Sequence, residues 1–303
     1  MMRSKELNLI ISARGVIVTE KNNAFKQKEE AELEKAVYTF DEIYSWIDEN
    51  QEVKEHYSAV KKELLKSVSI PKRLKKCSFD NFDDYTDNLK KIVKHLKGYS
   101  KELAFDNTSN SVFMFGEVGN GKTHLAVSII KELIKKEAIK NTVKHKIAED
   151  LKLANDENVI RVAGDEWGYH IAGTIEIKGA RKIEFMQGPE LFQELKNSFN
   201  DKSKDTGKVL DKYKKADVLI WDDILTAKKT DWVLEQIHSI ISYRYKEELP
   251  IIFTSNLSVE NFNNLASNDD DYRGKRIFSR IVDMCQGNLF KFNNKDYRLN
   301  SIN

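Results

Sequence analysis

The sequence predicts an α/β protein whose core has three layers, with a parallel sheet between helices. Short apolar runs alternate with helical stretches from Ser111 onward, whereas the region before residue 70 is helical in pattern and rich in Lys and Glu. Strands that alternate with helices along a chain are typical of a parallel sheet covered by helices on both faces. We therefore expect a small, mainly helical amino-terminal region ahead of a larger α/β domain.

Five short segments are predicted to be strands, because each is apolar enough to be buried in a parallel sheet. They are 111–115, 182–186, 217–221, 251–255 and, with a weaker pattern, 289–292. Helical patterns separate them. The predicted helices are 85–96, 123–136, 189–199 and 231–245.

The amino-terminal region is predicted to be helical from residue 24 to residue 68, since apolar side chains recur there at helical spacing. The tripeptide Ser69-Ile70-Pro71 interrupts that spacing, which indicates a linker. The sequence thus predicts two parts, an amino-terminal region at 1–69 and a larger domain at 70–303.

Composition sets limits on the class of protein. The chain has 303 residues with a formal net charge of +2, so any surface that binds nucleic acid must be locally basic. No apolar run reaches the roughly 18 residues of a membrane-spanning helix, and we do not expect the first residues to form a secretory signal. The two cysteines, Cys77 and Cys285, form no CxxC pair. We expect reduced thiols, no zinc site and a cytoplasmic protein, in the host cytoplasm if the chain is phage-encoded.

The strongest motif fits the pattern GxxxxGK[ST] and consists of Gly116, Glu117, Val118, Gly119, Asn120, Gly121, Lys122 and Thr123. A predicted strand leads into it and a predicted helix leads out, which makes a chance match in a glycine-rich turn the weaker interpretation. Glycines let successive backbone N–H groups face phosphate oxygens, and the helix adds its positive end. Lys122 is expected to neutralise the β- and γ-phosphates of ATP, and the Thr123 hydroxyl to bind Mg²⁺.

Two carboxylates follow the predicted strand at 217–221. Ligands of parallel sheets gather at the carboxyl ends of strands, so Asp222 is expected to hold the magnesium ion, largely through water. Asp223 is placed to polarise the attacking water. The alternative is an aspartate pair that only caps the next helix.

Two later segments add polar candidates. Asn256 follows a predicted strand and can orient the attacking water, although an asparagine can also simply begin a turn. Arg276 and Arg280 lie four residues apart and share one face of a helix. Such a face can stabilise transition-state charge on a neighbouring subunit, or it can carry two solvated arginines in surface ion pairs.

These segments in their order resemble a known family. The chain contains FGEVGNGKTHLA, VLIWDDI, IIFTSNLS, RIFSRI and LFKFNNKDYR. Over residues 70–300 it is similar to the AAA+ helicase loaders of the DnaC and DnaI type, with the transposition helper IstB as a relative. His124 after the Lys-Thr pair and the segment CSFDNF after Ile70-Pro71 are also typical of that group.

The resemblance implies an AAA+ P-loop ATPase that binds a DnaB-type hexameric helicase and assists its loading on single-stranded DNA. It implies slow ATP hydrolysis stimulated by partners, and self-association through the ATP sites. His124 extends the ATP-binding motif, and the two aspartates match the second nucleotide motif. Asn256 matches the first sensor position. Arg280, with Arg276 one turn before it, matches the finger that acts in trans, and Arg298 matches the residue that senses nucleotide in cis.

The chain also departs from the family. Asp223 stands where many relatives have Glu, which is consistent with slow hydrolysis. Residues 141–181 resemble an insertion, in which 159–162 and 174–177 have the pattern of an added strand pair. Region 1–69 has no cysteine-rich zinc module, and we expect it to bind the partner.

Family DNA contacts lie on the helix before the second nucleotide motif and on the segment after it. They correspond here to Phe199, Lys228, Lys229 and Thr230. An aromatic ring can stack on a base and lysines can contact phosphates, but a core phenylalanine and solvated lysines are equally compatible with the sequence.

Other functions stay open at this point. An IstB-like transposition helper would act on duplex DNA, and a non-hydrolysing protein would use ATP only to hold subunits together. A P-loop kinase is disfavoured, because the late arginine segment has no clear use in it.

Overall fold

The computed structural model divides the chain into two compact units. The first comprises residues 1–66, 104–106 and 134–180, and the second comprises 67–103, 107–133 and 181–303. The residues that the structure describes are 7–12, 15–20, 40–105, 108–150, 159–161, 174–176, 181–200, 206–224, 231–257 and 272–293. Most of the predicted amino-terminal region and most of the predicted insertion fall in the first unit. A domain boundary at residue 69 stays a prediction.

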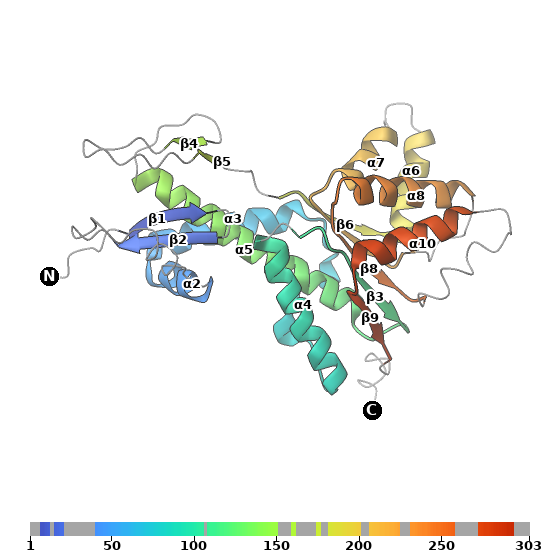
Figure 1. The fold of residues 1–303 in the computed structure, drawn as a ribbon, viewed down its shortest axis with the longest axis horizontal. Coiled ribbons are helices and arrows are strands. Elements are labelled where there is room, and N and C mark those ends of the chain that lie inside the picture. The colour runs from blue at the N-terminus through green and yellow to red at the C-terminus, as the bar shows by residue number, and fades with distance from the viewer. Residues whose placement is uncertain are drawn as a thin grey trace. The chain divides into compact units, whose positions relative to one another are not determined.

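The second unit is built on a parallel sheet of five strands in the order β6-β7-β8-β3-β9 (Figure 1). The strands are β3 (Val112–Gly116), β6 (Ile183–Gln187), β7 (Val218–Asp222), β8 (Ile251–Ser255) and β9 (Leu289–Phe292). All neighbours are paired in parallel. The predicted strands and the parallel sheet are confirmed, with small shifts in the bounds of the first three.

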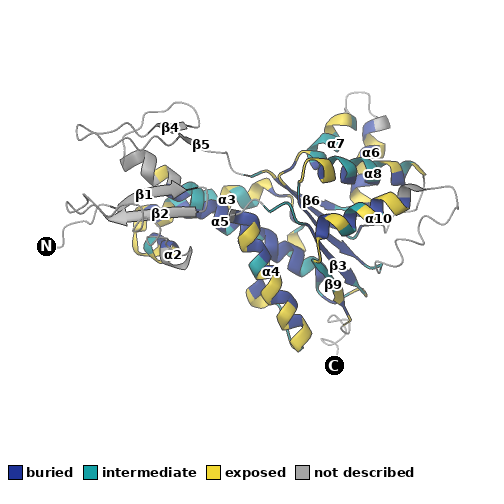
Figure 2. Cartoon of the chain, viewed as in Figure 1, coloured by how far each residue is buried: buried dark blue, intermediate teal, exposed yellow. Residues whose placement is uncertain are grey.

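Helices cover this sheet. They are α4 (Asp87–Phe105), α5 (Lys122–Asp150), α6 (Gly188–Asn200), α7 (Thr206–Lys214), α8 (Asp231–Lys246) and α10 (Tyr272–Cys285). Side chains of α6, α7, α8 and α10 share one core with Phe113, Trp221 and Phe253 of the strands. Figure 2 shows β3, β6, β7 and β8 mostly buried beneath their helices, which explains why their sequences are largely apolar, whereas β9 at the edge of the sheet is partly exposed.

The strand order positions the polar residues. Strands β7, β8 and β3 are consecutive neighbours, so their carboxyl ends lie along one edge of the sheet. Each predicted nucleotide motif follows one of these three strands. Residues that are far apart in the sequence therefore meet at this edge.

The first unit contains α2 (Phe40–Glu49) and α3 (Gln51–Ser67), as the helical pattern predicts. It also contains an antiparallel pair that the sequence analysis missed, β1 (Leu7–Ser12) with β2 (Gly15–Glu20). Two runs rich in β-branched residues around a two-residue loop were the signal for it. The strand pair predicted at 159–162 and 174–177 is confirmed as β4 (Val159–Arg161) with β5 (Thr174–Glu176).

Helix α5 is much longer than predicted, since it continues to Asp150 instead of ending at residue 136. Its later residues pack within the first unit, where Ala138, Ile139 and Val143 are buried. The ring of His145 stacks on the ring of His56 from α3, with centroids 4.0 Å apart. Tertiary packing of this kind stabilises helical turns whose local pattern is weak.

Candidate nucleotide-binding site

The phosphate-loop motif forms a tight loop between β3 and α5. Gly116, Gly119 and Gly121 have φ angles of 138°, 85° and 89°, which residues with a side chain rarely adopt. A Cβ atom at Gly116 would collide with the backbone oxygen of Phe292 on β9. A Cβ atom at Gly121 would lie 2.5 Å from the ring of Phe82. The backbone conformation thus favours glycine at all three positions, and close packing requires it at Gly116 and Gly121.

Lys122 is buried and its ammonium group lies against the loop itself. Its Nζ atom donates hydrogen bonds to the carbonyl oxygens of Gly116 (2.8 Å) and Glu117 (2.5 Å), and it lies 3.3 Å from Oδ1 of Asn120. Asn120 in turn donates to the backbone oxygen of Phe292 at 3.2 Å. A phosphate group offers this ammonium stronger, charged acceptors than the neutral carbonyls.

His124 connects the loop to the segment that enters the second unit. Its Nε2 atom lies 2.9 Å from the backbone oxygen of Ser78 and 3.1 Å from Oδ1 of Asn81, so this nitrogen carries the proton. The ring of Phe82 packs edge-on against the imidazole. Burial lowers the pKa of His124, which favours the neutral ring. These contacts anchor the segment from Ser78 to Phe82 beside Gly121.

Asp222 is buried at the end of β7 and accepts three hydrogen bonds from side chains. Its Oδ1 atom accepts from the hydroxyls of Thr123 and Thr254, both at 2.7 Å, and its Oδ2 atom accepts from Gln187 at 3.2 Å. The predicted pair Thr123 and Asp222 is therefore in direct contact. Gln187 and Thr254 were missed by the sequence analysis, although their places at the ends of the neighbouring strands β6 and β8 were a signal.

Asp223 adopts a left-handed conformation, with a φ angle of 57°. Its backbone N–H donates to the Thr254 hydroxyl at 2.8 Å, and its Oδ1 atom accepts from the Asn256 amide at 2.7 Å. Burial raises the pKa of Asp223, the charge of Asp222 raises it further, and Lys122 opposes both effects. The structure thus brings the predicted residues Asp223 and Asn256 together.

The two predicted arginines lie on α10 in different surroundings. Arg280 is half-buried, and its Nη1 atom lies 2.9 Å from Nε2 of His238 on α8. Arg276 is exposed. Within the part of the chain that the structure describes, neither arginine forms an ion pair, so the interpretation as surface ion pairs gains no support.

The remaining predicted residues are not placed by the structure. Arg298, Lys228, Lys229 and Thr230 lie outside the described residues. Phe199 belongs to α6, but only its backbone is described. Their predicted roles stay predictions.

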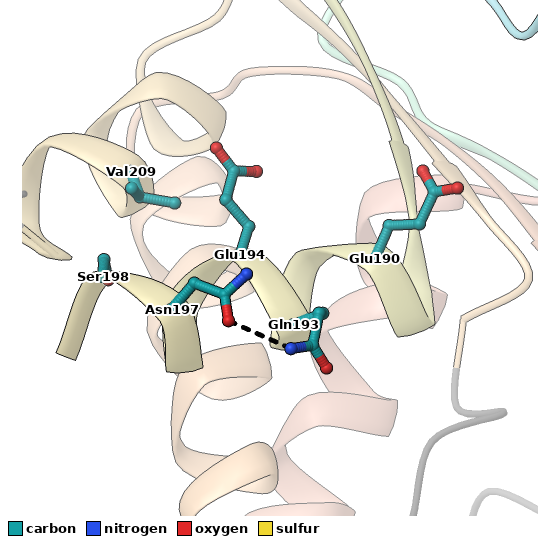
Figure 3. A pocket seen from close by; sticks show the side chains of 6 residues that line it. All are labelled: Glu190, Gln193, Glu194, Asn197, Ser198 and Val209. Atoms are coloured by element: carbon teal, nitrogen blue, oxygen red, sulfur yellow. Dashed lines mark hydrogen bonds between the residues drawn. The ribbon is translucent and has the colours of Figure 1, made fainter. Parts of the chain in front are cut away.

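A pocket of about 440 Å³ opens beside α6 and contains none of the predicted site residues. Figure 3 shows the side chains that line it, which are Glu190, Gln193, Glu194, Asn197, Ser198 and Val209. Two carboxylates among six lining residues repel phosphate groups.

Comparison with protein families agrees with this geometry. Residues 152–302 match the family described as IstB-like ATP binding protein. The matched segment includes Asp222, Asn256 and Arg280 but begins after the phosphate loop, so the loop is identified by its own motif and geometry.

Three proteins of Bacillus subtilis (strain 168) are similar to the chain. The uncharacterized protein YqaM is 25% identical over 232 residues, which are 74% of this chain and 57% of YqaM. The phage-like element PBSX protein XkdC is 26% identical over 79% of this chain and 73% of its own length. The replicative helicase loader DnaI is 22% identical over 72% of this chain and 58% of its own length. The chain thus spans little more than half of YqaM and DnaI.

Solved structures share the fold. The crystal structure of DnaI superposes with a TM-score of 0.52 and 20% identity, over 76% of this chain and 94% of that one. The DnaC helicase loader gives a TM-score of 0.50 and 23% identity, over 74% of this chain and all of that one. The parallel sheet and its helices are thus those of the AAA+ P-loop fold. Among the described residues, no helix is both long and apolar enough to span a bilayer.

Proposed function

We propose that the protein is an ATP-hydrolysing helicase loader, which binds a DnaB-type hexameric helicase and assists its loading on single-stranded DNA. The observation that carries the proposal is the convergence at one sheet edge of Thr123 with Asp222 and of Asp223 with Asn256. Similarity to proteins described as helicase loaders supports the choice of partner.

Within this site, Lys122 binds the β- and γ-phosphates, and the backbone of the glycine loop surrounds them. Asp223 accepts a proton from the attacking water or polarises it, and its raised pKa brings it closer to the range useful for a general base. Asn256 donates to Asp223 and thereby fixes the orientation of that carboxylate.

Magnesium fits the donor set at Thr123 and Asp222. A hydroxyl that donates to a buried carboxylate directs its lone pairs away from that carboxylate, and both groups are oxygen ligands of the hard type that Mg²⁺ prefers. When bound, the ion would neutralise charge on the β- and γ-phosphates. Residues Gln187 and Thr254 hold the Asp222 carboxylate in place for this role.

The finger role is proposed for Arg280, with Arg276 one turn before it on α10. In this arrangement the arginine of one subunit completes the nucleotide site of its neighbour. Arg298 is proposed to sense the nucleotide within its own subunit. Region 1–69 is proposed to contact the helicase, and Phe199 with Lys228, Lys229 and Thr230 to contact DNA.

Turnover by mixed subunits tests the shared site. Lys122→Ala and Arg280→Ala should each abolish phosphate release, because one removes a phosphate ligand and the other removes the finger. An equal mixture should recover part of the activity, since some interfaces then pair an intact loop with an intact arginine. Mixtures that stay inactive would contradict a site shared between subunits.

Co-purification tests the partner. The full chain should form a complex with its cognate replicative helicase, and the stability of that complex should depend on ATP. A parallel preparation of Lys122→Ala is the control, because it has the same surface outside the loop. Failure of both proteins to bind the helicase under any nucleotide condition would refute the loader function.

An IstB-like transposition helper is the second candidate, favoured by the family match over residues 152–302. The two functions differ in the form of DNA that they need. ATP-dependent, cooperative binding to duplex DNA would support the helper, whereas a preference for single-stranded DNA would support the loader.

A further inference from the structure

Arg280 of α10 contacts side chains of α8, which lies beside α10 (Figure 1). An arginine can only donate hydrogen bonds, so the 2.9 Å contact of Nη1 with Nε2 of His238 requires that nitrogen to be an acceptor. His238 is then neutral and carries its proton on Nδ1. The hydroxyl of Ser242 lies 3.3 Å from the same Nε2 atom and can donate to it as well.

A second support comes from Tyr245, also on α8. The guanidinium of Arg280 lies 5.9 Å from the centre of the Tyr245 ring, within the range of a cation–π contact. The Tyr245 hydroxyl donates to Oδ2 of Asp283 at 2.7 Å. Asp283 is the acidic residue one turn after Arg280 on α10, and this bond directs its carboxylate to the tyrosine.

The direct contacts of Arg280 are therefore with neutral groups. Its contacts in the described part of the chain are an imidazole nitrogen and an aromatic face, and no carboxylate is paired with it there. A guanidinium has five N–H donors in one plane, and the contact with His238 uses one nitrogen. The other nitrogens remain able to bind two oxygens of one phosphate group.

We propose that His238 is a positioning residue for Arg280, which holds the guanidinium oriented for the γ-phosphate of a neighbouring subunit's ATP. The inference rests on the finger role proposed for Arg280. A long arginine side chain loses much conformational freedom on ordering, and a neutral acceptor orders it without neutralising its charge. A carboxylate in the same place would compete with the phosphate for the cation.

Steady-state ATP hydrolysis by the full chain tests this role through two matched substitutions. His238→Leu removes the acceptor, and kcat should fall by about tenfold to a hundredfold, as expected for a misplaced catalytic group. The KM for ATP should stay unchanged, because the contacts of His238 given by the described residues are with Arg280 of α10 and Ser242 of α8. His238→Gln keeps an acceptor at similar reach and should retain most of the turnover.

Mixing experiments separate positioning from general damage. A defect in presenting Arg280 belongs to the subunit that donates the finger. The His238→Leu protein should therefore regain turnover when mixed with Lys122→Ala, whose arginine is intact, and should not regain it with Arg280→Ala. Recovery with Arg280→Ala instead would overturn the proposal.

The outcomes distinguish this inference from the proposed function. Full turnover by Arg280→Ala would refute the finger itself, and the inference would fall with it. Loss of turnover in Arg280→Ala together with wild-type turnover in His238→Leu would refute the inference alone. If the leucine variant does not fold, His238→Asn replaces it, since asparagine is polar and too short to reach Arg280. Wild-type turnover in His238→Asn would then refute the inference.

Discussion

The adjacent aspartates at the end of β7 differ in their hydrogen-bond partners. Asp222 accepts from Thr123, Thr254 and Gln187 and is buried, so its charge is well compensated by donors. Asp223 is only partly buried, and it has a raised pKa because burial and the charge of Asp222 act against its ionised form. Neighbours in sequence thus have different surroundings, which suit Asp222 to the proposed role of metal ligand and Asp223 to the proposed role of base.

Asp223→Asn should stabilise the nucleotide-free protein at neutral pH. A raised pKa means that the folded state binds the proton more tightly than the unfolded state does, so ionisation costs stability. That cost is absent below the ordinary value of 3.8 and is complete once the pH exceeds the raised value. Melting curves should therefore show a higher Tm for Asp223→Asn at pH 7, with a gap that closes on acidification.

The same variant should lose activity. Removal of a general base lowers turnover by about a hundredfold or more. A lower Tm at pH 7, or unchanged phosphate release with ATP, would contradict the role of Asp223. A variant that is both more stable and less active is expected when the ionised group that the reaction needs lowers the stability of the folded protein.

Two glycines provide a matched test of whether the phosphate loop needs glycine for stability. Gly121→Ala should destabilise the protein by about 1–2 kcal/mol, because φ is 89° and the new Cβ would press on the ring of Phe82. Gly98→Ala on α4 should instead stabilise it by about 0.5–1 kcal/mol, since its Cβ would meet nothing within 4 Å. Urea unfolding of both variants measures the difference. Equal midpoints would show that the loop does not need its glycines for stability.

Among the elements, α8 joins the end of α7 to the residue before β8 through one buried arginine. Nη1 of Arg244 donates to the backbone oxygens of Tyr213 (3.0 Å), Lys214 (3.1 Å) and Ala216 (2.6 Å), and Nη2 donates to that of Pro250 (2.7 Å). The first three carbonyls belong to the end of α7 and the residues after it, where helix carbonyls lack helical partners. Arg244 thereby ties the end of α7 to the start of β8.

Arg244→Met should lower the free energy of unfolding by about 3 kcal/mol or more, because it leaves several buried carbonyls without a donor. Lys246→Met on the same helix is the control, since that lysine is exposed and should change stability by about 0.5 kcal/mol at most. Denaturant titration followed by circular dichroism compares them. Similar midpoints for the two variants would exclude a structural role for the guanidinium.

Assembly of several copies is a property of the whole molecule, and the placement of Arg280 bears on it. The loop, the aspartates and Asn256 meet at the sheet edge of the second unit, whereas Arg280 is held by α8 with no anionic partner among the described residues. The proposed role of this cation is to complete the nucleotide site of a second copy of the chain. ATP would then act as a switch for assembly.

Sedimentation velocity of the full chain should show a larger species with ATP and Mg²⁺ than without nucleotide. Lys122→Ala should remain at the smaller size under both conditions, because it lacks the ammonium that binds the phosphates. Removal of Mg²⁺ with a chelator should act on the wild-type protein in the same direction. An identical size distribution with and without ATP would argue against nucleotide-driven self-association.

The sequence alone predicted the features whose signal is local. The phosphate loop is contiguous from Gly116 to Thr123, and the buried strands are visible as apolar runs. Both signals are local, because backbone conformation and burial constrain residues that are adjacent in the sequence. The hairpin of β1 and β2 had a local signal as well and was missed.

Tertiary structure decided which distant residues share the site. Gln187 and Thr254 support Asp222 only because parallel pairing aligns the ends of β6, β7 and β8. His238 meets Arg280 only because α8 packs on α10, and α5 continues past residue 136 where it packs within the first unit. Such contacts depend on register and packing between separate segments, and the spacing of residues along one segment does not encode them.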